Sequence, residues 1–319
     1  MMIEDWVEYR KINDAINKLI DNANTVPKIK KALRHVIKAG GKRTRPVIVL
    51  LSGKLCGGNY ADVMNVALAV ELIHTASLAH DDVIDRGMMR RNVETLHIKY
   101  DTSLAILVGD WLISKSVELV SIYNEEIIGD FARLGMMMAE GEVLDIYSID
   151  ENVNEEKYFD CISAKTAAIF AYSAKNACRI VSDDLRAAEY LFDYGKNLGI
   201  AYQLVDDLLE FLEIFEDKKS EFESRTLPMV YEEVFGFEES VAKVLAEDED
   251  VAAVIGYQNQ IVAACGKKAS KVLPADMLVQ KAAKAMGGSG GGDAEFARGG
   301  GKLLATKGLE AVKESLRVA

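Results

Sequence analysis

Two acidic clusters in the sequence could hold divalent metal ions. The first lies in the stretch LAHDDVIDRG and places Asp81, Asp82 and Asp85 directly after a long apolar run. On a helix, Asp81 and Asp85 share one face, whereas Asp82 points about 100° away. Mg²⁺ prefers oxygen ligands, takes few of them from protein, and would offset the repulsion between these carboxylates. For this cluster taken alone, a solvated helix end is the alternative.

The second cluster, in GIAYQLVDDLLEF, contains Asp206, Asp207 and Glu210. Its carboxylates interrupt an apolar helical pattern, so some of them are expected near the core, where unpaired acids are strongly disfavoured. Two such clusters facing one another across a helical bundle would form a cage for divalent ions.

Basic residues accompany both acidic clusters. The segment KAGGKRTRP brings Lys42, Arg43 and Arg45 together beside two glycines, and Arg90 and Arg91 follow the first acidic cluster. Arginine binds phosphate through two parallel hydrogen bonds. A solvated basic patch is the alternative, but the combined pattern predicts two diphosphate sites. One would be bridged by metal and the other held directly by cations.

The elements that must position these groups are predicted to be helices. No proline occurs between Pro46 and Pro228, and proline-free spans of this length are typical of helices. Apolar residues recur at steps of three and four, as in Val63, Val66, Ala67, Val70, Ile73 and Ser77 and again in Leu191, Tyr194, Leu198, Tyr202, Val205 and Leu209. We therefore expect an all-α fold, a single-domain bundle of ten or more long helices spanning residues 1–286.

The C-terminal segment departs from this pattern. Residues 287–301, GGSGGGDAEFARGGG, are more than half glycine, which predicts a flexible connector. Residues 302–319 are predicted to form a short final helix.

Composition excludes several functions. The formal net charge of −12 over 319 residues argues against a general nucleic-acid binder, whose surface would be basic. We expect no secretory signal in the polar N-terminus and no membrane-spanning segment. The four cysteines show no close pairing, which favours reduced thiols in a cytosolic protein and makes zinc improbable.

Taken together, these motifs resemble those of the trans-isoprenyl diphosphate synthases, also called polyprenyl synthetases. The resemblance covers about residues 38–230 and rests on GGKRTRP, HDDVIDRGMMRRNVETLH, GD at 109–110, EGEVLD at 140–145, KT at 165–166, GIAYQLVDDLLE and TLP at 226–228. It implies long helices around a central cavity, usually in a homodimer. It also implies condensation of an allylic diphosphate with isopentenyl diphosphate, assisted by three Mg²⁺ ions.

The resemblance also implies roles for individual residues. The direct metal ligands would be Asp81, Asp85 and Asp206, supported by Asp82 and Asp207. The allylic diphosphate would be bound by Arg90, Lys165, Thr166 and Gln203. Isopentenyl diphosphate would be bound by Lys42, Arg45, His74 and Arg91. His80 would be a hydrogen-bonding neighbour of the acidic cluster.

This chain departs from the family pattern at a few positions. Glu210 stands where the family more often has aspartate, and Asn92 replaces the glycine usual after the arginine pair. A lysine common before the TLP threonine is Ser224 here, so Lys218 and Lys219 are the candidates for the remaining phosphate-binding lysine, of which we choose Lys219.

Small side chains upstream of the first acidic cluster predict a long product. Ala76 and Ser77 stand where the family uses bulky aromatics to stop elongation, so a product of about twenty carbons or more is expected. The floor of the channel would be set by Ile73 or by residues 136–138. Two alternatives stay open, a class I terpene cyclase and a non-catalytic subunit of a two-component synthase. The GGKRTRP cluster disfavours the first, and the five retained aspartates disfavour the second.

Overall fold

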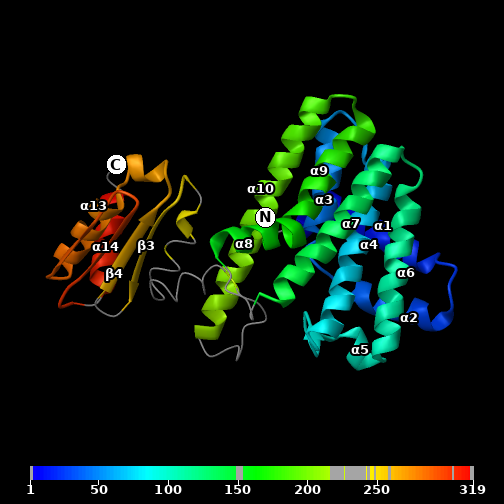
Figure 1. The fold of residues 1–319 in the computed structure, drawn as a ribbon, viewed down its shortest axis with the longest axis horizontal. Helices are drawn as coiled ribbons and strands as arrows, with labels where there is room; N and C mark the ends of the chain where they lie inside the picture. Colours follow the sequence, from blue (N-terminus) through cyan, green and yellow to red (C-terminus); the bar gives the residue numbers. More distant parts are fainter. Residues whose placement is uncertain are drawn as a thin grey trace. The chain divides into compact units, whose positions relative to one another are not determined.

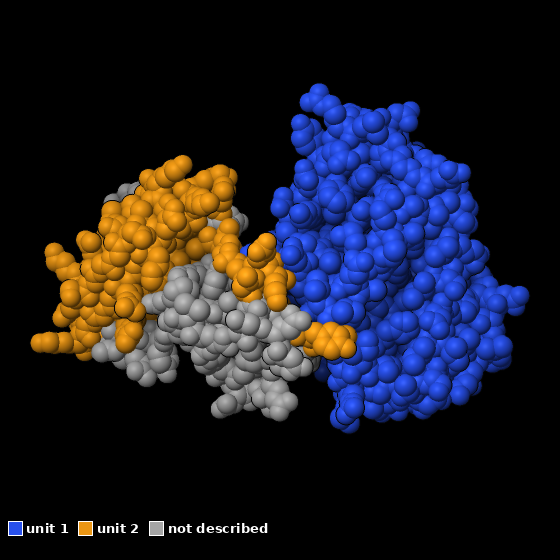
Figure 2. Space-filling model, viewed as in Figure 1, with its two compact units in different colours: residues 1–144, 159–203 blue, residues 145–158, 204–319 orange. Residues whose placement is uncertain are grey.

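The computed structural model of the chain is mostly helical, as predicted (Figure 1). It describes residues 3–148, 154–215, 226, 242, 245–247, 249–257, 260–303 and 305–316. These fall into two compact units, which we call the first unit (residues 1–144 and 159–203) and the second unit (residues 145–158 and 204–319) (Figure 2). Each unit is described by itself.

Helices account for nearly all of the chain up to residue 215. They are α1 (Val7–Asp21), α2 (Pro27–Lys38), α3 (Thr44–Leu55), α4 (Tyr60–Ile84), α5 (Leu96–Lys99), α6 (Thr102–Val120), α7 (Glu125–Ile146), α8 (Glu155–Ile162), α9 (Ala168–Val181) and α10 (Leu185–Phe215). A short 3₁₀ turn (Ile3–Asp5) precedes α1, a π-helical segment (Ser163–Ala167) joins α8 to α9, and a two-stranded ribbon, β1 (Met89–Arg90) and β2 (Val93–Glu94), follows α4.

Helix α4 is the centre of the first unit and packs against α3, α6 and α9. Its apolar positions are buried as the periodicity predicts, with Val63 and Ala67 fully buried. By length and composition alone α4 could cross a membrane, but 67% of its most apolar window is buried inside the protein. That burial is typical of a core helix.

Helix α10 is also present where predicted, and Leu198 and Tyr202 of its apolar series pack against the core, but not every member of that series is buried. Tyr194 and Val205 are more than half exposed. The buried face of its first-unit part contains Gly195 and Gly199, which lie directly against the backbone of α9 and the residue preceding it. A Cβ atom at Gly199 would approach the Cα of Ala167 to 2.5 Å, so the close approach of the helices requires glycine.

The second unit contains a four-stranded antiparallel sheet of order β3-β4-β6-β5. Its strands and helices are β3 (Ala252–Tyr257), β4 (Gln260–Cys265), a 3₁₀ turn (Ala269–Lys271), α13 (Ala275–Ala285), β5 (Ser289–Gly292), β6 (Phe296–Gly300) and α14 (Ala305–Leu316). Helices α13 and α14 lie on the same side of the sheet (Figure 1) and bury an apolar core that includes Ile261, Val279 and Val312.

The predictions of a single helical bundle through residue 286 and of a flexible connector at residues 287–301 are wrong. Both β5 and β6 lie inside the glycine-rich segment. Gly290 and Gly299 face one another across these strands, and a Cβ at either would come within 2.9 Å of Val279 Cγ1. At these two positions the absence of a side chain lets the sheet pack closely against α13. The predicted C-terminal helix is confirmed as α14.

Candidate active site

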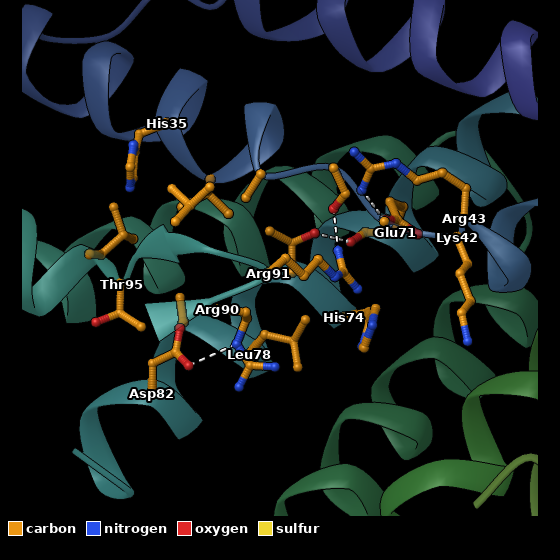
Figure 3. Close-up of a pocket in the computed structure, with 18 of the residues that line it drawn as sticks. His35, Lys42, Arg43, Glu71, His74, Leu78, Asp82, Arg90, Arg91 and Thr95 are labelled. Atoms are coloured by element: carbon orange, nitrogen blue, oxygen red, sulfur yellow. Dashed lines mark hydrogen bonds and ion pairs between the residues drawn. The ribbon is translucent and has the colours of Figure 1, made fainter. Parts of the chain in front are cut away.

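The first acidic cluster ends helix α4, and its carboxylates point in different directions. Asp85 is the C-terminal cap, and its backbone N–H donates to the carbonyl of Asp81. Asp82 is 9% exposed, and its Oδ1 accepts a 2.7 Å hydrogen bond from Arg90 Nε (Figure 3). Asp82 therefore orients Arg90, while Asp81 and Asp85 stay on the face predicted for metal.

Asp81 lies in an electrostatic environment that disfavours its charge. The pKa of Asp81 is raised to about 7, mainly by burial and secondly by the charge of Glu142. Lys165 lowers this pKa, and Asp85 raises it by a smaller amount. Lys165 Nζ lies 2.8 Å from Glu142 Oε2. Glu142 belongs to the EGEVLD motif at residues 140–145, but no role was predicted for it from the sequence.

This carboxylate cluster fits a divalent cation. A buried acid with a pKa near 7 and two further carboxylates nearby has excess negative charge that a cation would neutralise. Within the described part of the chain, no three side chains of metal-ligand type converge on one position. Mg²⁺ commonly takes only one or two ligands from protein and the rest from water and phosphate, so Asp81 and Asp85 would be sufficient on this side.

A cationic pocket lies beside Asp82 in the first unit. It encloses about 760 Å³ of space, part of which is open to solvent, and its lining includes residues of the 39–43 loop, the start of α3, α4 and the β1–β2 ribbon. Five of the predicted diphosphate-binding residues line it, namely Lys42, Arg45, His74, Arg90 and Arg91. Figure 3 shows Lys42, His74, Arg90 and Arg91 of this set extending from different elements. The structure thus brings together residues that the sequence separates by up to fifty positions.

His74 is a neutral acceptor in this pocket. Burial lowers the pKa of His74 well below its usual value, and the positive charge of Arg45 lowers it further. His74 Nε2 lies 3.1 Å from Arg45 Nη1, so the uncharged imidazole accepts from the guanidinium. Arg45 also stacks over the Phe170 ring, 4.8 Å from its centroid. His74 therefore positions Arg45.

Lys42 and Arg91 line the pocket from two strained turns. Lys42 Nζ lies 5.6 Å from the centroid of the Tyr202 ring, a cation–π contact that sequence reasoning missed. The guanidinium of Arg91 donates to the carbonyl of Gly40. Arg91 and Asn92 both have positive φ, 52° and 61°, as a two-residue type I′ hairpin turn requires.

Arg43, the middle cation of the GGKRTRP motif, does not serve this pocket as a free cation. Its Nη1 lies 2.5 Å from Glu71 Oε1, and the two side chains are only 4% and 5% exposed. It also donates to Asn13 Oδ1 and to the carbonyl of Ile37. Of the three cations that the motif brings together, Arg43 is thus the one that compensates a buried charge, because the Glu71 carboxylate needs a charged partner.

The predicted allylic-site residues Thr166 and Gln203 are brought together. Thr166 Oγ1 donates to Gln203 Oε1 at 2.7 Å. Thr166 and Lys165 lie on the π-helical segment, an irregularity that is frequent at functional sites. The backbone of Lys165 packs directly against Gly141, where a Cβ would come within 2.7 Å of the Lys165 Cα.

The second acidic cluster lies on the part of α10 that belongs to the second unit. Asp206 is exposed. Asp207 is 6% exposed and accepts a 2.5 Å hydrogen bond from the Tyr158 hydroxyl. This confirms that one carboxylate of the cluster is buried. That the two acidic clusters face one another stays a prediction, as does the role of Glu210.

Several other predicted positions have definite surroundings. His80 contacts α6, where its Nε2 lies 3.2 Å from the Ile106 carbonyl oxygen and 3.8 Å from Asp110 Oδ1. Ala76 is fully buried, whereas Met136 is 58% exposed and therefore does not form a channel floor within this chain. Lys218, Lys219 and Ser224 lie outside the described residues.

Comparisons with known proteins agree with this geometry. The polyprenyl synthetase family profile matches residues 26–222. Geranylfarnesyl diphosphate synthase of Methanosarcina mazei is 46% identical over 243 residues, which cover 76% of this chain and 82% of that protein. Geranylgeranyl diphosphate synthase of Sulfolobus acidocaldarius is 35% identical and covers 70% and 73%.

Solved structures show the same likeness. A geranyltranstransferase from Methanosarcina mazei has a TM-score of 0.65 at 43% identity, covering 76% of this chain and 85% of that one. A polyprenyl synthase from Caulobacter crescentus CB15, complexed with calcium and isoprenyl diphosphate, has a TM-score of 0.64 at 32% identity, covering 76% and 79%.

A helical bundle with a carboxylate cluster beside a cationic pocket defines an enzyme that handles diphosphates together with divalent metal ions. The chain belongs to the polyprenyl synthetase family and is accordingly an isoprenyl diphosphate synthase, a prenyltransferase. The family match ends before the sheet of the second unit begins.

Proposed function

We propose that the protein condenses an allylic diphosphate with isopentenyl diphosphate, head to tail and in the trans configuration, to give a prenyl diphosphate of about twenty carbons or more. The observation that carries this proposal is the cationic pocket next to the Asp81 carboxylate cluster. Both sites lie near the end of α4. The anionic site would bind one diphosphate through metal ions, and the cationic site would bind the other diphosphate directly.

Isopentenyl diphosphate would occupy the cationic pocket. Lys42 lines it from the loop before α3, Arg45 from α3 and Arg91 from the β1–β2 turn, and a guanidinium group binds phosphate through two parallel hydrogen bonds. The neutral His74 keeps Arg45 directed into the pocket without adding a charge. The cations thus fix the diphosphate and leave the alkene end free to approach the allylic carbon.

The allylic diphosphate would lie on the Asp81 side. Asp81 and Asp85, together with Asp206, would hold Mg²⁺, three ions by the family resemblance. When bound, these ions neutralise the negative charge that accumulates on the departing diphosphate. Lys165 and Arg90 act on the charge of Asp81 in the structure and would contribute to binding the same diphosphate.

The reaction proceeds by ionisation. The allylic C–O bond breaks, its electron pair leaves with the diphosphate, and a delocalised carbocation remains. The double bond of isopentenyl diphosphate attacks this cation to form the new C–C bond, and a proton passes to the diphosphate as the alkene is restored. Fixed positive groups at the leaving diphosphate stabilise the transition state, and the protein supplies no nucleophile.

Product length is proposed from two observations. Ala76 and Ser77 are small residues in the turns that precede Asp81. Similar proteins have names that specify geranylgeranyl and geranylfarnesyl products. We therefore propose a product in that range.

We further propose that the enzyme is a cytosolic homodimer. On α6, Ile106, Ile113 and Val117 are 42%, 37% and 48% exposed and share one helix face, which a second copy would cover. The four free cysteines are consistent with a reducing compartment.

The test is incubation of the purified chain with labelled isopentenyl diphosphate, Mg²⁺ and allylic primers of increasing length, followed by mass analysis of the products. Incorporation of label supports the proposal. Consumption of a prenyl diphosphate without isopentenyl diphosphate would point to a terpene cyclase. Failure with every primer, reversed by adding a partner protein, would point to a non-catalytic subunit.

A further inference from the structure

Two cysteines from distant parts of the chain lie against one another in the first unit. Cys56 is the C-terminal cap of α3, and Cys178 lies in the last turn of α9. Burial, followed by a hydrogen bond between the two thiols, raises the pKa of Cys178 to about 12. Cysteine spacing does not reveal this pair, because the packing of α3 against α9 creates it.

Backbone contacts around the pair hold the two thiols together. The Cys56 N–H donates to the Ser52 carbonyl at 3.1 Å, which continues the hydrogen bonding of α3 to its end. The chain after α3 then passes so close to α9 that a Cβ at Gly58 would lie 2.4 Å from Val181 Cγ1. These contacts fix the chain on both sides of the Cys56 thiol, beside the helix that carries Cys178.

The two thiols differ in their access to solvent. Cys178 is 0% exposed, whereas Cys56 is only half-buried. Gly57, which follows Cys56, is exposed and has φ of 92°. A Cβ at Gly57 would meet no atom of the described part of the chain within 4 Å. A small oxidant can therefore reach Cys56 first, and the buried Cys178 thiol is the neighbour that would resolve the product.

We propose that Cys56 and Cys178 form an oxidation site, at which hydrogen peroxide converts the two thiols into a reversible disulfide that ties the end of α3 to the end of α9. In the first step the Cys56 thiol loses its proton and its sulfur attacks one peroxide oxygen. The O–O bond breaks, the other oxygen leaves with that proton as water, and a sulfenic acid remains. In the second step the Cys178 sulfur attacks the sulfenic sulfur, and the hydroxyl leaves with the Cys178 proton as a second water.

The disulfide would lie far from the cationic pocket. Arg45, in the first turn of α3, stacks over Phe170, in the first turn of α9. The two helices therefore run in the same direction from the pocket to the cysteines. Cys56 follows Arg45 by eleven residues and Cys178 follows Phe170 by eight, which is about two to three helical turns. The bond would hold the far ends of the helices together and leave the KM for isopentenyl diphosphate unchanged.

The test is treatment of the folded chain with hydrogen peroxide, alkylation of the remaining thiols in acidic denaturant, and peptide mapping without reductant. Acid stops thiol–disulfide exchange, because the attacking species is the thiolate. We expect one linked peptide pair, Cys56 with Cys178, which has lost two hydrogen atoms and is separated by dithiothreitol. Recovery of Cys178 as a free thiol beside an oxidised Cys56, or a link from Cys56 to any other cysteine, would overturn the proposal.

The other two cysteines are internal controls. The Cys161 thiol donates to the Gly141 carbonyl at 3.6 Å, and the Cys265 thiol donates to the Leu273 carbonyl at 3.2 Å. Both are buried and should be recovered as alkylated thiols. Cys161→Ser is the matched control variant, and it should give the linked peptide in the same yield as the wild type.

Variants of the pair separate the two chemical steps. In Cys178→Ser the reaction should stop at the Cys56 sulfenic acid, which dimedone traps. In Cys56→Ser the buried Cys178 should stay a thiol. If Cys178→Ser fails to fold, Cys178→Ala decides. Dimedone labelling of Cys178 in Cys56→Ser, equal to that of Cys56 in Cys178→Ser, would contradict the proposed order of reaction and overturn the site.

Stability gives a second readout. The disulfide closes a long loop, so oxidation should raise the urea midpoint of the first unit by about 1 M or more, and Cys56→Ser should show no such rise. An unchanged or lowered midpoint in the wild type would show that the folded chain does not accommodate the bond, and would overturn the proposal. Neither readout requires prenyl transfer, so a failure of the proposed function would leave this test intact.

Discussion

The buried ion pair between Arg43 and Glu71 should hold the cationic pocket in place. Arg43 lies between two pocket cations, Lys42 and Arg45, and has φ of 50° at the start of α3. Its side chain reaches α1, α2 and α4 through Asn13, the Ile37 carbonyl and Glu71. We expect removal of this anchor to affect stability and isopentenyl diphosphate binding together.

The magnitude follows from burial. Both side chains are at most 5% exposed, so removing one partner leaves an uncompensated charge in the core, which costs about 3–5 kcal/mol. Arg43→Met and Glu71→Leu should each lose that amount. The double variant leaves neither charge in the core and should therefore lose less than either single variant, which corresponds to a coupling of at least about 3 kcal/mol.

Tryptophan fluorescence during urea unfolding reports the unfolding of the first unit, which contains the Arg43–Glu71 pair. Both tryptophans, Trp6 and Trp111, belong to the first unit, so their signal reports its unfolding even though a chain of two units need not unfold in one step. Steady-state kinetics should show a KM for isopentenyl diphosphate raised about tenfold in the double variant, about 1.4 kcal/mol of binding, with the KM for the allylic primer unchanged. Losses that add to within about 0.5 kcal/mol would refute a coupled pair.

Three further predictions concern single side chains. Because burial depresses the pKa of His74, its contribution to stability is fully present above the unfolded value near 6.5 and is lost as the pH falls below it. Between pH 7.5 and pH 5.5 the wild type should therefore lose more unfolding free energy than His74→Gln, by up to about 1.4 kcal/mol, and equal losses in urea titrations would contradict this. Ser77→Phe should shorten the product with little loss of unfolding free energy. Ala76→Phe should also shorten the product but lose about 1–3 kcal/mol of unfolding free energy, because it overpacks a fully buried site. Mass analysis measures the first effect and urea unfolding the second, and an unchanged product in both variants would exclude these positions from the channel. Gly141→Ala should displace the Lys165 backbone and raise the KM for the allylic primer. Gly135→Ala, on the same helix, should leave this KM unchanged. Similar kinetics in both variants would show that the close contact between Gly141 and the Lys165 backbone is unimportant for substrate binding.

The helical part of the fold was predictable because its signals are local. The spacing of apolar residues predicts α4 and most of α10, and the acidic clusters interrupt those patterns where the structure places carboxylates near the core. The family resemblance assigned Lys42, Arg45, His74 and Arg91 to one diphosphate, and in the structure these four residues line one pocket.

The errors arose where tertiary contacts override local pattern. The sequence treats Arg43 as one of three similar cations, and nothing local reveals that Glu71, 28 positions away, is buried beside it. Glycine composition predicts flexibility for residues 287–301, because the approach of Val279 to the sheet is visible only after folding. The short strands β3 and β4 were missed because an apolar run of six residues also fits a buried helix.

The tip of the β1–β2 ribbon influences how this site can change during evolution. Left-handed backbone at Arg91 is tolerated at a cost of about 1–2 kcal/mol, and the guanidinium approaches the opposite loop only because Gly41 has no side chain there. An insertion or deletion in this two-residue connection would change the direction of Arg91 relative to the strands. Natural variation should therefore change residue types at this tip long before it changes the tip's length.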